Sequence, residues 1–231
     1  MAAKCFGVLA VVLVMGGALP VGAQGAEKPY AVAAPLSEYL IADEGAEVAL
    51  ARSAAPAGIS GGAEVLVLGK EGYRTAVKGG NGFVCLVERG FAADRTFPEF
   101  WNPKIRGPIC VNAAAVGSYL KLERMQAKLA MEGKTKEQID TAVKAAWAKG
   151  ELVAPSDGAM SYMLSKQQYV GDEPKSWHPH LMWFVAGDAV KSWGADAKGS
   201  PVMGFPDPAD RMTILMLTVD HWSDGTMAPA M

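Results

Sequence analysis

The sequence lacks the short motifs by which many enzymes and metal proteins are recognised. It contains no phosphate-binding P-loop, no H-E-x-x-H zinc motif, no C-x-x-C pair and no EF-hand loop. Histidine is also scarce, with 3 residues in a chain of 231. No local motif therefore indicates catalysis or metal binding, and only a site assembled from distant parts of the chain stays open.

An excess of basic charge is missing as well. The chain has 22 Lys and Arg against 24 Asp and Glu, which gives a formal net charge of −2. No basic stripe suggests nucleic acid as a partner, and no lysine-rich amphipathic helix suggests binding to a membrane surface. Half of the residues are hydrophobic and 20% are charged, a balance typical of a folded globular protein.

A long apolar run occurs near the N-terminus and is too short to span a bilayer comfortably. Lys4 precedes the uncharged residues 5–19 (CFGVLAVVLVMGGAL), and Val21 and Ala23 supply small residues where a signal peptidase would need them. The pattern predicts a secretory signal peptide over residues 1–23. We therefore expect a secreted or periplasmic protein that keeps no membrane span after cleavage.

Cysteine is nearly absent, with 3 residues in the whole chain. Cys5 lies in the predicted signal peptide, which leaves Cys85 and Cys110 as an even pair. In an oxidising compartment such a pair predicts a disulfide bond, and two buried free thiols are the alternative. A chain of this length can build an adequate hydrophobic core without metal or many disulfides.

Hydrophobic patterning predicts one α+β domain. Alternating or continuous apolar segments suggest strands at 64–68, 73–78, 83–88, 158–165, 180–185 and 212–219. We therefore expect an antiparallel sheet of about six strands. The first three should form a meander, because their connections are short. The last should be central, because it is hydrophobic almost throughout.

Helical patterns precede and interrupt the expected strands. A helix is predicted over 36–55, with Ser37 as its cap, and should pack on the sheet. Two further patterns, at 112–131 and 135–150, predict an inserted αα-hairpin. Thr135 and Gln138 have the spacing of a capping box for its second helix. The domain should therefore occupy residues 36–231, after a loose N-terminal arm at 24–35.

Aromatic and methionine side chains are the candidates for a ligand pocket. The proline-rich segment 90–110 contains Phe91, Phe97, Phe100 and Trp101. We favour a role in fixing this segment to the core, and a pocket lip is the alternative. The methionines of the late segments are Met160, Met163, Met182, Met212 and Met216. They suit core packing or, alternatively, a deformable apolar cavity against the sheet.

Four residues are proposed from these segments as ligand contacts. Trp101, Met182 and Trp183 supply apolar surface, and Arg106 offers a guanidinium group to an anionic ligand.

The histidines lie at predicted strand ends. His178 and His180 precede or begin one strand, and Asp220 and His221 follow another. If these strands pair, three imidazoles and one carboxylate could meet, a set of ligands that suits zinc. The interpretation that we favour is that these polar residues simply face solvent where the strands end. Accordingly we expect no cofactor, with zinc as the alternative.

Four runs carry a resemblance to known proteins. They are NGFVCLVER (81–89), FWNPKIRGPIC (100–110), PHLMWFV (179–185) and HWSDGT (221–226). On these runs the chain resembles a family of secreted bacterial proteins of unassigned function. The resemblance implies export and a single shared domain, and it supplies no site residues.

The sequence therefore predicts an exported, non-enzymatic domain that binds a small molecule or another envelope protein. The alternative is a hydrolase or metal-dependent enzyme that uses the His/Asp cluster.

Overall fold

The computed structural model describes residues 30–92 and 94–230. The predicted signal peptide lies outside these ranges, as do residues 24–29 of the predicted arm. The remaining part of the arm is attached to the domain, because the Tyr30 hydroxyl donates a 2.5 Å hydrogen bond to Asp172. No helix within the described ranges is long and apolar enough to cross a membrane.

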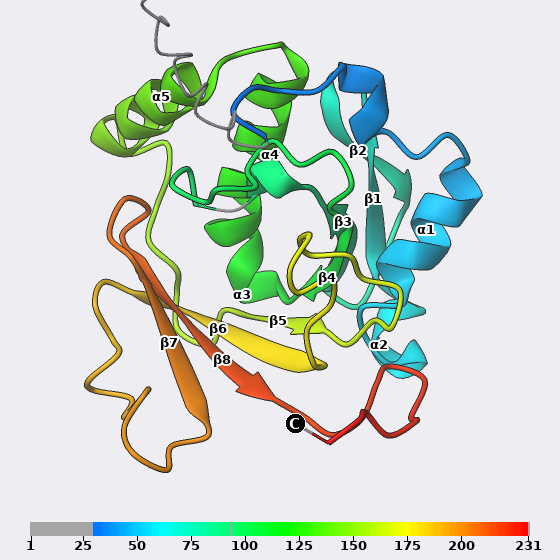
Figure 1. Cartoon of the computed structure of the whole chain (residues 1–231), viewed down its shortest axis with the longest axis vertical. Coiled ribbons are helices and arrows are strands. Elements are labelled where there is room, and N and C mark those ends of the chain that lie inside the picture. Colours follow the sequence, from blue (N-terminus) through cyan, green and yellow to red (C-terminus); the bar gives the residue numbers. More distant parts are fainter. Residues whose placement is uncertain (1–29, 93, 231) are drawn as a thin grey trace, which may run out of the picture.

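A single eight-stranded sheet runs through the molecule in the order β2-β1-β3-β4-β5-β6-β8-β7 (Figure 1). Its strands are β1 (Glu64–Gly69), β2 (Gly72–Val77), β3 (Val84–Glu88), β4 (Gly107–Val111), β5 (Met160–Met163), β6 (His180–Ala186), β7 (Val202–Asp207) and β8 (Met212–Thr218). The α+β class is confirmed. The expectation of about six antiparallel strands was wrong in number, and one pair, β1 with β3, is parallel.

The predicted meander of the first three strands is wrong. β1 and β2 form a hairpin, but β3 returns to the other side of β1 and lies parallel to it. The burial of β1 explains the arrangement. Leu66 belongs to the hydrophobic cluster on one face of the sheet and Val65 to the cluster on the other. A strand that is apolar on both faces is favoured inside a sheet rather than at its edge.

Two strands occur where the sequence predicted irregular links. β4 contains Pro108 but pairs with β5 only at Cys110 and Val111. The proline therefore lies outside the hydrogen-bonded pairs between β4 and β5. β7 contains Pro206 and forms the outer edge, where a missing N–H group is tolerated. Because β7 covers the flank of β8, the last strand is second from the edge and not central as expected.

The N-terminal helix is shorter than predicted. It divides into η1 (Leu36–Tyr39), α1 (Glu44–Arg52) and α2 (Ala57–Ser60). Asp43 caps α1 through a 2.8 Å bond from the Ala46 N–H group, so Ser37 is not its cap. As expected, α1 packs on the sheet, where it contacts β1, β3 and β4.

The inserted αα-hairpin is confirmed. It comprises α4 (Tyr119–Met131), preceded by the single turn α3 (Ala113–Val116), and α5 (Lys136–Ala148). Thr135 and Gln138 form the predicted capping box of α5. α4 lies on the face of the sheet opposite α1 (Figure 1).

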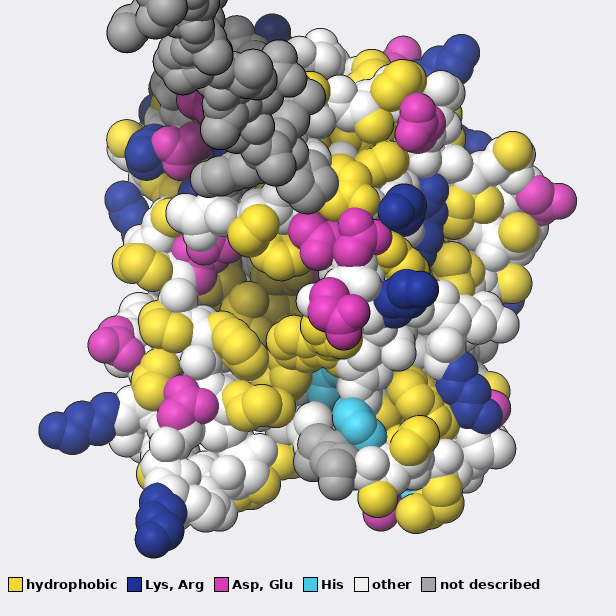
Figure 2. Space-filling view, viewed as in Figure 1, with side chains coloured by type: hydrophobic (Ala, Val, Ile, Leu, Met, Phe, Trp, Pro, Cys, Tyr) yellow, Lys and Arg dark blue, Asp and Glu magenta, His cyan; other side chains and the backbone are white. Residues whose placement is uncertain are grey.

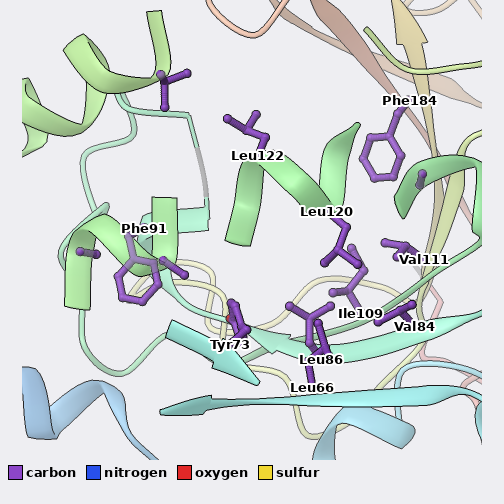
Figure 3. Packing of buried hydrophobic residues seen from close by; sticks show 14 of the residues in the cluster. Leu66, Tyr73, Val84, Leu86, Phe91, Ile109, Val111, Leu120, Leu122 and Phe184 are labelled. Carbon is purple, nitrogen blue, oxygen red and sulfur yellow. The ribbon is translucent and has the colours of Figure 1, made fainter. Parts of the chain in front are cut away.

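The core has two parts, one on each face of the sheet. In the larger part, Leu66, Leu86 and Ile109 of the sheet lie beneath Leu120 of α4 (Figure 3). The smaller part lies under α1 and contains the disulfide between Cys85 and Cys110. These cysteines are direct partners on β3 and β4, so the predicted disulfide is confirmed.

Candidate functional site

A cleft opens on the face of the sheet that carries α4. It consists of two adjoining hollows of about 480 Å³ and 400 Å³, which share much of their lining. The shared apolar residues are Phe97, Met163, Val170, Phe205 and Ile214. In the space-filling view this cleft is the hydrophobic hollow near the centre, with acidic side chains around it (Figure 2).

Strand register explains why one wall of the cleft is apolar. Met182 of β6 pairs with Met216 of β8, and Ile214, two residues before Met216, faces the same side. Phe205 of the edge strand β7 pairs with Ile214 and extends this wall. Methionines thus line the cleft, as the alternative interpretation of the sequence suggested, and Met182 and Met216 also contribute to the core.

The loop after β3 forms the opposite wall. Phe91, Phe100 and Trp101 are fully or almost fully buried, which confirms that aromatic residues fix this loop to the core. Phe97 remains partly exposed and lines the cleft. The start of the loop is held by Arg89, whose guanidinium group forms a buried 2.8 Å ion pair with Glu47.

A carboxyl group and a phenol form the polar part of the cleft wall. Glu88, at the end of β3, accepts a 2.6 Å hydrogen bond from the Tyr119 hydroxyl at the start of α4. Both residues line both hollows. Tyr119 is held in place by Phe184, on which its ring stacks at a centroid distance of 3.9 Å.

Burial changes the protonation of this pair. Desolvation raises the pKa of Glu88 to about 7, and the hydrogen bond from Tyr119 opposes the shift. Desolvation also raises the pKa of Tyr119 well above its usual value. Glu88 therefore changes its charge near neutral pH, whereas Tyr119 remains a hydrogen-bond donor there.

A second carboxyl group lies behind the first. Glu123, one turn along α4 from Tyr119, is 2% exposed, and neither of its carboxylate oxygens has a hydrogen-bond partner among the described residues. Burial, followed by the charge of Glu88, raises its pKa well above the usual range. Burial without a paired cation therefore disfavours the ionised form of Glu123.

Acidic side chains dominate the charged lining of the cleft. Besides Glu88 they are Asp94, Glu99, Glu173, Asp207 and Asp210. Asp210 is neutralised by Arg95 at 2.6 Å. Desolvation, with help from Asp210, raises the pKa of Asp207 to about 6. Arg89 is the one arginine or lysine among the described lining residues, and it is already paired with Glu47.

The residues predicted as ligand contacts are found in different places. Met182 lines the cleft. Trp101 is buried in the core, and Arg106 donates to the carbonyl oxygens of its own loop and of Glu38, so it supports the loop. Trp183, adjacent to Met182 on β6, lines a separate hollow elsewhere on the surface.

The residues predicted as metal ligands are also dispersed. His180 lines the cleft, with its Nδ1 atom 2.7 Å from the carbonyl oxygen of His178, and burial lowers its pKa. His178 and Asp220 border another hollow, and His221 pairs with Asp220 at 2.7 Å. Within residues 30–92 and 94–230 no group of three or more His, Cys, Asp or Glu residues is arranged to hold a metal ion.

Sequence reasoning missed the pair of Glu88 and Tyr119. One signal was present, because Glu88 occupies the same strand face as Val84 and Leu86, where an apolar residue would be expected. A carboxyl group in such a row suggests a buried polar contact.

Comparison with family models, with curated proteins and with solved structures finds no match. A function for the cleft is therefore inferred from the residues that line it.

Proposed function

We propose that the protein is a binding domain whose cleft accepts a small molecule with an apolar body. The observation that carries the proposal is the cleft itself, a cavity of about 480 Å³ with apolar walls, the hydrogen-bonded pair of Glu88 and Tyr119 and a few further acidic side chains. Ligand sites of this size typically combine apolar walls with a few fixed polar groups. Here those groups are positioned by a strand end and a helix start, both packed on the core.

Binding is favoured over covalent catalysis by the composition of the cleft. Its described lining contains no serine, threonine or cysteine, so His180 has no nucleophile beside it to activate. A hydrolase with a serine, threonine or cysteine nucleophile thus has no support from the described lining of the cleft.

We also propose that the protein is exported and belongs with the secreted bacterial proteins that it resembles. The predicted signal peptide at 1–23 and the disulfide between Cys85 and Cys110 both suit a protein that works outside the cytosol, secreted or in a periplasm. Another envelope protein is a second possible partner, but no described surface argues for it as strongly as the cleft does for a small molecule.

A neutral fluorescent probe tests the proposed function. N-phenyl-1-naphthylamine brightens in apolar surroundings, and we expect it to bind the purified protein saturably at one site. Ile214→Trp fills the cleft and should weaken binding about tenfold or more.

Val153→Trp is the matched control, because Val153 is 53% exposed and does not line the cleft. It should bind the probe within about twofold of the wild type. The proposal fails if the wild type does not bind, or if the two tryptophan variants bind equally well while both are folded by circular dichroism.

A further inference from the structure

We propose that the ligand of the cleft is an organic cation, an amine or quaternary ammonium group carried on an aromatic or aliphatic body. This inference rests on the proposed function and adds the chemical class of the ligand. It is carried by the charge of the lining, by the Glu88 carboxyl group in the cleft wall and by two exposed aromatic rings.

The charge of the lining is the first argument. After the ion pairs of Arg95 with Asp210 and of Arg89 with Glu47 are set aside, the remaining charged residues of the described lining are all acidic. They are Glu88, Asp94, Glu99, Glu173 and Asp207. A cleft lined by one sign of charge attracts ligands of the opposite sign and repels those of the same sign.

The second argument is the place of Glu88 in the cleft wall. Its carboxyl group accepts a hydrogen bond from Tyr119 and neighbours the buried carboxyl group of Glu123. Glu88 lines both hollows, so a ligand in either can approach it. A bound ammonium group would give the carboxylate a charge-assisted hydrogen bond and compensate for its desolvation.

The third argument is aromatic. Trp177 and Phe205 are 38% and 39% exposed, and their ring centroids lie 6.2 Å apart on the lining of the cleft. Exposed apolar side chains that lie together at a groove, unlike isolated ones, commonly mark a binding site. Their faces attract cations, and the attraction to an organic cation is added to the apolar contact with its body.

Three naphthalene probes of similar size separate charge from apolar contact. They are 1-naphthylmethylammonium, 1-naphthylmethanol and 1-naphthoate, measured by isothermal titration calorimetry at pH 8, where Glu88 is largely ionised. We expect the cation to bind about tenfold or more tightly than the neutral alcohol, and the anion to bind most weakly.

Two matched variants assign the preference to Glu88. Glu88→Gln keeps an oxygen acceptor for Tyr119 but removes the charge, and should weaken the cation about tenfold while the alcohol stays within about twofold. Glu71→Gln makes the same change of charge at an exposed residue outside the cleft and should alter neither affinity. Trp177→Ala, which leaves Glu88 in place, should weaken the cation by a factor of about five.

The outcomes distinguish the two proposals. If the alcohol binds as tightly as the cation, or if Glu88→Gln weakens both equally, the ligand is not selected for positive charge and this inference is overturned, while the apolar binding function stands. If the cation does not bind at all, the inference fails outright. The titration with N-phenyl-1-naphthylamine then decides separately whether the cleft binds any apolar molecule.

Discussion

The raised pKa of Glu88 predicts that the protein loses stability as the pH rises through the neutral range. In the folded chain the pKa of Glu88 is about 7, against 4.5 for an unperturbed glutamate. Between these values the folded state binds more protons than the unfolded state, so the free energy of unfolding falls as the pH increases. The stabilising contribution is complete below about pH 4.5 and is lost by about pH 7.

The magnitude follows from the size of the shift. Each unit of pKa is worth about 1.4 kcal/mol, which sets a ceiling of about 3 kcal/mol for Glu88. The side chain is partly exposed in the cleft, and its titration is linked to that of Glu123. These two features reduce the expected loss between pH 5 and pH 8 to about 1–2 kcal/mol.

The groups around Glu88 determine how the experiment is read. Tyr119 and Glu123 face it from α4, Tyr73 approaches from β2 and Arg89 follows it in the chain. Both tyrosines have raised pKa values and do not titrate below pH 8. Glu123 titrates in the same direction as Glu88, so the measurement reports on the carboxyl pair.

Urea unfolding at pH 5 and pH 8 measures the effect in the wild type and in Glu88→Gln. Over this interval the free energy of unfolding should fall by about 1–2 kcal/mol more in the wild type than in the variant. Other titrating groups, such as Asp207, contribute to both proteins, so their effect cancels in the comparison. An identical pH dependence in the two proteins would show that Glu88 has an ordinary pKa, and the description of the cleft wall would be wrong.

Two further predictions concern the rest of the fold. The Cys85–Cys110 disulfide closes a loop with a sequence separation of 25, so replacing both cysteines with alanine should cost about 3–4 kcal/mol in urea unfolding, and a loss below about 1 kcal/mol would contradict this. Arg95→Met leaves Asp210 buried and unpaired and should cost about 3–5 kcal/mol, whereas Arg95→Met with Asp210→Leu should cost clearly less. Equal thermal stability of these single and double variants would show that the stranded carboxylate is not the cause.

Local patterns predicted the parts of the fold that depend on local physics. The αα-hairpin and its capping box at Thr135 follow from periodicity and from hydrogen bonds within a few residues. The strands at β6 and β8 are also where hydrophobic patterning placed them. In contrast, β4 and β7 were missed because each contains a proline that the position in the sheet accommodates. β3 pairs with the edge of β1 that β2 leaves free, and this arrangement buries both faces of β1. The local sequence pattern does not specify which edge a later strand will join.

The candidate site was less accessible to sequence reasoning. Met182 was proposed as a ligand contact because methionines cluster in the late strands, and it does line the cleft. Glu88 and Tyr119 are 31 residues apart and meet only because α4 packs across the sheet beside the end of β3. The pairing of residues so distant in the chain, like the dispersal of the histidines, is decided by tertiary packing.

Methyl NMR on the full-length protein with ¹³C-labelled methionine tests binding in the cleft most directly. On addition of N-phenyl-1-naphthylamine, the methyl signals of Met163, Met182 and Met216 should shift, because these side chains line the cleft and would contact the aromatic probe. Met125, which lines a separate hollow, should keep its signal. Unchanged signals from all three cleft methionines at saturating probe, or shifts confined to Met125, would contradict the proposed site.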